Sequence, residues 1–187
     1  MLINHDRAKI VNAIIYFSKN TKFCGKTKLY KLMYYLDFLH FKETGRSVTG
    51  MDYNAWEFGP VPASLSNELS NDALKPDMKE SISIQPKNEK QFVAIKAKKP
   101  FDDLYFTKRE LRILKNVAYM FHEAKAKDMV ESSHLPNEPW DKTIKNRGLK
   151  ARIDYMLALD GSSESISEEE ALERIADREE MKKVFSG

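Results

Sequence analysis

A carboxylate and an imidazole lie within the most apolar stretch of the chain. Asp37 and His40 lie three residues apart within residues 29–41, where nearly every other side chain is apolar. On a helix this spacing places both on one face, and a carboxylate beside an imidazole could act as an acid–base pair. A buried carboxylate is costly unless it is hydrogen-bonded. We therefore favour a structural clasp, in which Asp37 bonds to Trp56, a tyrosine hydroxyl or Lys28, over a catalytic role or a contact with a partner.

A second candidate for chemistry is the Ser133-His134 pair, which suggests a nucleophile and its base. Adjacent residues do not usually bring a serine oxygen onto the neighbouring imidazole, and no glycines of a nucleophile elbow flank the serine. We expect Ser133 to end a helix and His134 to be packed or hydrogen-bonded.

Metal and cofactor motifs are not evident in the sequence. The four histidines (His5, His40, His122 and His134) show no ligand spacing, and the single cysteine, Cys24, cannot build a zinc site. None of the seven glycines forms a phosphate-binding loop. We therefore expect no catalytic residue, no metal, no cofactor and no enzymatic activity.

Lysines gather in the first third of the chain, near Tyr16 and Phe23. A basic patch beside aromatic residues could bind phosphates, but a solvated loop would look the same. No helix carries Arg, Asn and Gln at a spacing that would read bases. We do not expect nucleic-acid binding, although it stays open as an alternative. The lysines are Lys19, Lys22, Lys26, Lys28 and Lys31.

These residues need elements to position them, and hydrophobic periodicity predicts mostly helices. Residues 26–43 are apolar on every side, which is typical of a central buried helix, and Gly45 suits a left-handed cap. Other helices are predicted over 6–19, after Pro62, behind the capping box at Thr107, over 126–133, from Pro139, and after Ser167.

Extended structure is predicted in two places. Residues 51–58 alternate loosely, but Pro60 and Pro62 should prevent regular strand pairing there. Residues 82–95 read as a β-hairpin that must pack on other elements. Residues 153–159 could be a strand or a helical turn. The expected fold class is α+β and mostly helical: a compact multi-helix domain around a buried central helix, with a small antiparallel β-hairpin.

The length of 187 residues suits one domain with a small extension. We place the main domain at 1–149 and an extension with a charged helix, packed on the same domain, at 150–187. Charges near the N-terminus exclude a signal peptide, and no stretch is apolar for long enough to span a membrane. We expect a cytoplasmic protein that does not bind membranes.

The ordered set of motifs resembles a known family. K-L-x-K-L-x-Y-Y-x-D-F runs from Lys28 to Phe38, and Y-x-A-W-x-x-G-P-V-P runs from Tyr53 to Pro62. T-x-x-E-L at 107–111, Ser133-His134 and Trp140 follow. Together they resemble the Panacea domain, the SocA-like antitoxin domain of bacterial and phage toxin–antitoxin operons.

The resemblance implies an antitoxin that neutralises a cognate protein toxin by binding it directly. It also leaves open an adaptor that delivers its toxin to a bacterial ATP-dependent protease. The positions that match the motifs are expected to be mainly structural: Lys28, Asp37, Trp56, Gly59, Pro60, His134 and Trp140. As exposed partner-binding residues near the Gly-Pro bend, we predict Arg46, Tyr53 and Phe58.

Overall fold

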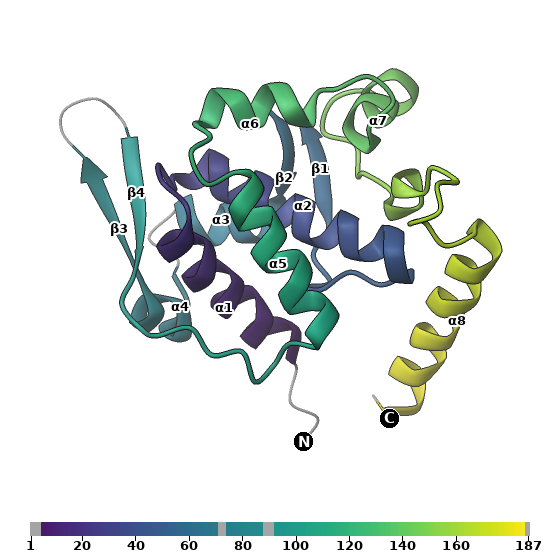
Figure 1. The fold of residues 1–187 in the computed structure, drawn as a ribbon, viewed down its shortest axis with the longest axis horizontal. Helices are drawn as coiled ribbons and strands as arrows, with labels where there is room; N and C mark the ends of the chain where they lie inside the picture. The colour runs from purple at the N-terminus through teal and green to yellow at the C-terminus, as the bar shows by residue number, and fades with distance from the viewer. Residues whose placement is uncertain (1–4, 71–73, 88–91, 186–187) are drawn as a thin grey trace.

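The computed structural model describes residues 5–70, 74–87 and 92–185. Its centre is helix α2 (Lys26–Thr44), which the other helices surround (Figure 1). Leu29, Leu32, Met33 and Leu36 on this helix are fully buried. The prediction of a buried central helix is confirmed, and so is the α+β, mostly helical fold class.

The helices around α2 begin and end close to the predicted residues. Only α4, a short helix that opens on Pro76, was not anticipated. Among the described residues, no helix combines the length and the apolar character that crossing a membrane requires. The surrounding helices are α1 (His5–Asn20), α3 (Ala63–Ser70), α4 (Pro76–Ser81), α5 (Lys108–Met120), α6 (Ala126–Ser133), α7 (Pro139–Arg147) and α8 (Glu168–Phe185).

Helix ends follow the local chemistry of the sequence. Gly45 ends α2 in the left-handed region, with φ +66°, and its N–H donates to the Phe41 carbonyl at 2.7 Å. Thr107 caps α5: its hydroxyl accepts from the N–H of Glu110, whose carboxylate accepts from the N–H of Thr107. Both predicted caps are confirmed.

The prediction that prolines prevent strand pairing at residues 59–62 is wrong. Strand β1 (Tyr53–Trp56) pairs antiparallel with β2 (Gly59–Pro62), in the register that places Ala55 opposite Pro60 and Trp56 opposite Gly59. We call this pair the front hairpin, and residues 56–59 its tip.

The backbone directions explain why the prolines fit. Ala55 exchanges both of its backbone hydrogen bonds with the segment on its other side: its N–H donates to Ala151 at 2.8 Å and its carbonyl accepts from Lys150 at 2.8 Å. Residues opposite each other share a hydrogen-bonding direction in antiparallel pairs, so Pro60 and Pro62 face away from β1. Their missing N–H groups therefore cost no bond between the strands.

A second hairpin joins β3 (Ile82–Lys87) to β4 (Phe92–Ala97). It lies at the opposite end of the molecule from α8 (Figure 1). The N–H of Ile95 donates to the Cys24 carbonyl at 2.9 Å, so the hairpin is tied to the connection between α1 and α2. The predicted hairpin and its packing are confirmed; part of its predicted turn, at residues 88–89, lies outside the described residues.

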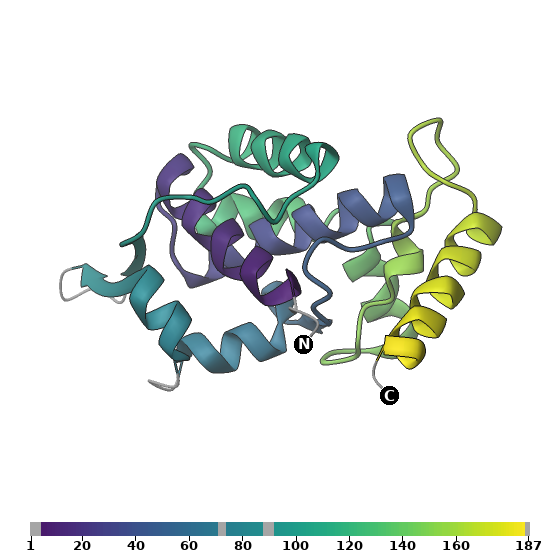
Figure 2. The ribbon, with the colours of Figure 1, turned by 90° about the horizontal axis from the view of Figure 1, so that it is seen from below.

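Residues 153–159, which the sequence left open as a strand or a helical turn, contain a helical turn, and a strand-like bridge lies just before them. Arg152 forms a bridge with Asn54 of β1, and Tyr155–Ala158 form a single 3₁₀ turn. Beyond them α8 lies at one end of the molecule (Figure 2). The guanidinium of Arg174 on this helix donates to the Thr44 carbonyl at 2.6 Å. The boundary at residue 149 stays a prediction.

Candidate functional site

Asp37 fastens α2 to the segment that leads into the front hairpin. Its Oδ1 accepts from the N–H groups of Val48 and Thr49, each at 2.8 Å, and its Oδ2 accepts from the hydroxyls of Thr49 and Tyr53, the latter at 2.7 Å. Burial raises the pKa of Asp37 to about 6, while these hydrogen bonds lower it. The predicted clasp to a tyrosine is therefore present, whereas Trp56 and Lys28 bond elsewhere.

His40 performs a similar local task. Its Nδ1 lies 2.6 Å from the Arg46 carbonyl and 3.2 Å from the hydroxyl of Thr44. The imidazole thus stabilises the turn after α2, and burial lowers its pKa. Asp37 and His40 have separate partners, which argues for two structural contacts.

Lys28 closes the end of another helix. The side chain is fully buried, and its Nζ donates to the carbonyls of Lys22, Phe121 and Ala124 at 2.6–2.7 Å, with a longer contact of 3.3 Å to His122. Three of these carbonyls follow α5 directly, where a cation is favourable and where carbonyls lack partners within the helix.

Lys31 lies one turn further along α2, is equally buried, and has far fewer partners. Its Nζ donates to the Pro60 carbonyl at 3.1 Å, and no other hydrogen bond or carboxylate partner is present within the described part of the chain. Burial lowers the pKa of Lys31 to about 7. The Pro60 carbonyl is available because it faces away from β1.

Gly59 lies directly on the end of the Lys31 side chain. Its φ is +94°, and a Cβ there would lie 2.7 Å from Lys31 Cε and 2.6 Å from Ser133 Oγ. Both the backbone conformation and the close approach require glycine. The G-P motif is therefore structural. Gly59 leaves room for α6 and Lys31 to approach, and the carbonyl of Pro60 accepts the hydrogen bond from Lys31.

Trp140 holds the other side of the tip. Its Nε1 donates to the Trp56 carbonyl at 3.0 Å, and its ring stacks on His134, with 3.7 Å between ring centroids. His134 is packed, as predicted, and its buried Nε2 has no hydrogen-bond partner among the described residues. Burial and the nearby charge of Lys31 lower the pKa of His134.

Between these two attachments the tip projects into solvent. Phe58 is 65% exposed and Trp56 is 40% exposed, while Leu135, in the connection after α6, is 53% exposed. Large apolar side chains on a fixed backbone are typical of protein–protein contacts.

Two of the predicted partner-binding positions do not fit the prediction. Tyr53 is fully buried, because its hydroxyl reaches Asp37 inside the core, so the expectation of an exposed side chain is wrong. Arg46 is exposed but lies beyond the C-terminal end of α2, about 20 Å along the helix axis from Lys31 and the bend above it. Phe58 has both the expected exposure and the expected place.

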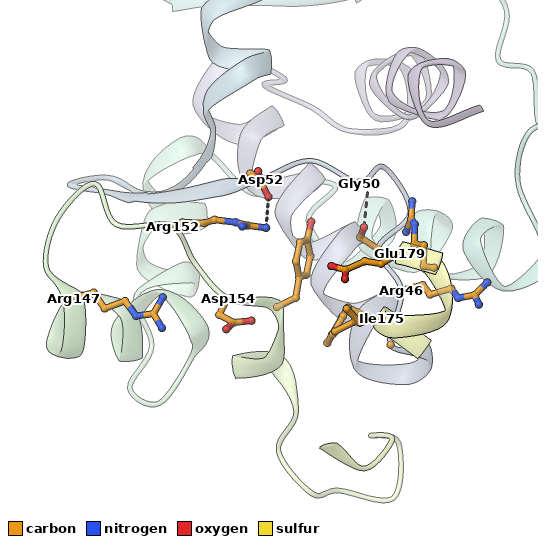
Figure 3. A pocket seen from close by; sticks show the side chains of 13 residues that line it. Arg46, Gly50, Asp52, Arg147, Arg152, Asp154, Ile175 and Glu179 are labelled. Atoms are coloured by element: carbon orange, nitrogen blue, oxygen red, sulfur yellow. Dashed lines mark hydrogen bonds and ion pairs between the residues drawn. The ribbon is translucent and has the colours of Figure 1, made fainter. Parts of the chain in front are cut away.

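Arg46 instead lines a pocket of about 320 Å³ between α8 and the segments that follow α2 and α7 (Figure 3). Arg152 pairs with Asp52 at 2.7 Å, while Arg46 and Arg147 lie on opposite sides and pair with no carboxylate of the described residues. Guanidinium groups bind carboxylates or phosphates well, but Asp154 and Glu179 in the same pocket offset their charge.

The structure weakens the nucleic-acid alternative. Lys28 and Lys31, two of the five clustered lysines, are fully buried and cannot contact phosphate. Lys22 pairs with Glu123 at 2.7 Å. Of the five lysines, Lys19 and Lys26 are therefore left for the patch that the sequence suggested.

The Ser133-His134 pair is not a catalytic arrangement. The hydroxyl of Ser133 donates to the Val130 carbonyl within α6, which ends at Ser133. Cys24 is buried, and burial raises the pKa of its thiol to about 11, so it is a poor nucleophile.

Sequence reasoning missed Lys31 as a site residue. The signal that could have revealed it is its position: a lysine in the middle of a helix that is apolar on every side must be buried.

A family model describes most of this architecture. The model of the antitoxin SocA-like Panacea domain matches residues 29–141, which include Lys31, Asp37, the front hairpin and Trp140. No curated protein and no solved structure matches the chain. Because the matched segment covers more than half of the sequence, the chain belongs to the antitoxin SocA-like, Panacea domain family.

Proposed function

We propose that this protein neutralises a cognate protein toxin by binding it directly, and that the tip of the front hairpin is the centre of the contact. Membership of the antitoxin family supports the role in general terms. The observation that carries the choice of surface is the exposure of Phe58 and Trp56 on a loop that is held on one side by the buried Lys31 and on the other by the half-buried Trp140.

Occlusion is the mechanism that suits this surface. A fixed hairpin tip can enter a concave site on the toxin without losing much conformational freedom. An interface of ordinary size would bury about 1,200–2,000 Å² in total, which is more than the tip alone provides. Leu135 and the start of α7 adjoin the tip and would extend the contact.

Growth of cells that express the product of the adjacent reading frame tests the proposal. Co-expression of the wild-type chain should restore growth, whereas Phe58→Ala should restore it poorly. Tyr119 is a matched control, because it is an aromatic residue with 86% exposure on α5, which is not part of the front hairpin. Neutralisation that is intact in Phe58→Ala, or equally impaired in Tyr119→Ala, would contradict this choice of surface.

An adaptor for a protease is the second candidate, and α8 is the observation that favours it. An adaptor needs a second binding surface, and Leu172, Met181 and Val184 expose apolar side chains on that helix. Replacing all three by serine should abolish delivery of the toxin to a purified ATP-dependent protease while leaving neutralisation unchanged. Equal rates of toxin degradation with the wild-type chain and with the triple variant would exclude α8 from such a role.

A further inference from the structure

The tip of the front hairpin is attached to the domain at two points. Trp140 donates to the carbonyl of Trp56, which is the first residue of the tip. Lys31 donates to the carbonyl of Pro60, which directly follows the tip. The side chains of Glu57 and Phe58 extend from the backbone between them. Neither Glu57 nor Phe58 has a positive φ, so the strained conformation of the turn falls on Gly59.

The attachment by Lys31 is unusual in its chemistry. An ammonium group has three donors, and here the described residues offer one acceptor, at 3.1 Å, with no countercharge. A methionine would fill almost the same space without the cost of desolvating a charge. What the amine adds over methionine is therefore the bond to the Pro60 carbonyl.

The bond acts on the part of the hairpin that has least support of its own. The hairpin is short, and the prolines of β2 leave hydrogen bonding between the strands to the pairs Asn54–Val61 and Trp56–Gly59. Gly59 brings no side chain that could pack. Without the contact from Lys31, the described residues would leave Trp140, at Trp56, as the hydrogen-bonded attachment of residues 56–60 to the helices, and packing would have to hold the rest.

We propose that Lys31 is a positioning residue for partner binding: by holding the Pro60 carbonyl, it keeps the hairpin tip in the conformation that presents Phe58. The inference rests on the proposed function, in that the tip is taken to be the toxin-binding surface. Lys31 itself is buried and touches no partner. It acts through preorganisation, which lowers the entropy lost on binding.

Amide hydrogen exchange followed by NMR tests the positioning without any partner. The probes are the N–H groups of Asn54, Gly59 and Val61, compared with those of Ile14 and Ile15 in the core of α1. In Lys31→Met, exchange at the hairpin should become about tenfold faster relative to α1, because the local opening of the hairpin becomes easier. An unchanged ratio would overturn the proposal.

Lys28→Met is the matched control. Lys28 is an equally buried lysine on the same helix, but its bonds go to the end of α5. Its loss should not make exchange at the hairpin faster relative to α1, because the global stability falls while local opening of the hairpin becomes no easier. If Lys31→Met does not fold, Lys31→Gln takes its place, because the glutamine side chain is too short to reach Pro60. Exchange at the hairpin relative to α1 that equals that of the wild type then also counts against the proposal.

A double-mutant cycle with the purified product of the adjacent reading frame tests the consequence for binding. Lys31→Met should weaken binding about fivefold in the wild-type background and have no effect in the Phe58→Ala background, because the two residues act as one unit. Additive effects would show that Lys31 does not act through the tip. If the wild-type chain does not bind this product, the proposed function fails, while the exchange experiment still decides whether Lys31 positions the tip.

Discussion

The two buried lysines of α2 show how differently one residue type is used at two positions about one turn apart on the same helix. Lys28 has four backbone acceptors, of which three lie at the end of α5. Lys31 has a single acceptor, beneath the front hairpin. The two lysines are equally buried, but their hydrogen bonding differs. Lys28 has an acceptor for each of its N–H donors, whereas Lys31, beside the exposed tip, has one acceptor and no countercharge within the ranges that the structure describes.

Asp37 is a third buried ionisable side chain on α2, and its replacement should lower the stability more than replacement of either lysine. In Asp37→Asn, two of the four hydrogen bonds would meet an amide donor in place of an acceptor. We expect the free energy of unfolding to fall by about 4 kcal/mol. Urea denaturation measures it; a loss below about 1 kcal/mol would show that the site rearranges easily.

Lys28→Met should have the next largest effect. It removes the Lys28 ammonium from the Lys22 and Ala124 carbonyls and so weakens the end of α5, and the free energy of unfolding should fall by about 3 kcal/mol. Lys31→Met should change it by less than about 1 kcal/mol at pH 7, because the removed bond and the removed desolvation cost nearly cancel. Equal losses in the two variants would remove the distinction between the lysines.

The pH dependence of stability sharpens the comparison further. Lys31 has a pKa of about 7 in the folded protein and about 10.4 in the unfolded chain, so between these values the unfolded chain binds more protons. The stability of the wild type should therefore rise from pH 7 to pH 9, by about 2 kcal/mol relative to Lys31→Met. Urea denaturation of both proteins at several pH values measures this difference, and parallel pH profiles would contradict it.

Phe58→Ala should have the smallest effect on stability. The side chain is mostly in solvent, so the free energy of unfolding should change by less than about 0.5 kcal/mol while neutralisation is impaired. Thermal unfolding of the purified variant checks the first part. A large loss of stability would mean that Phe58 belongs to the core and would remove it from the proposed surface.

Much of the fold could be predicted because it depends on local patterns. The apolar character of residues 26–43 identified the central helix, and the caps at Gly45 and Thr107 follow from rules that involve only a few neighbouring residues. Pairing of β2 could not be predicted, since it depends on which way the backbone of Ala55 faces, and residues 150–151 determine that.

The candidate site was less predictable, because lysines are mostly exposed and the residue type alone does not indicate which of them are buried. Lys28 and Lys31 look like the exposed lysines near them until α2 is known to be enclosed. Arg46 is close to the front hairpin in the sequence, yet the length of α2 separates them. Tyr53 looked like a surface aromatic, although its alternation with the buried Ala55 could have placed it inside.

The short segment 150–153 has a consequence for how this domain can be divided. It covers the free side of β1, yet it lies beyond residues 29–141, where similarity to the family ends. A fragment cut at residue 141 would leave Tyr53 and Ala55 with an open strand edge, which invites pairing with other molecules and aggregation. The strand edge of the front hairpin is therefore covered by residues beyond the segment that matches the family.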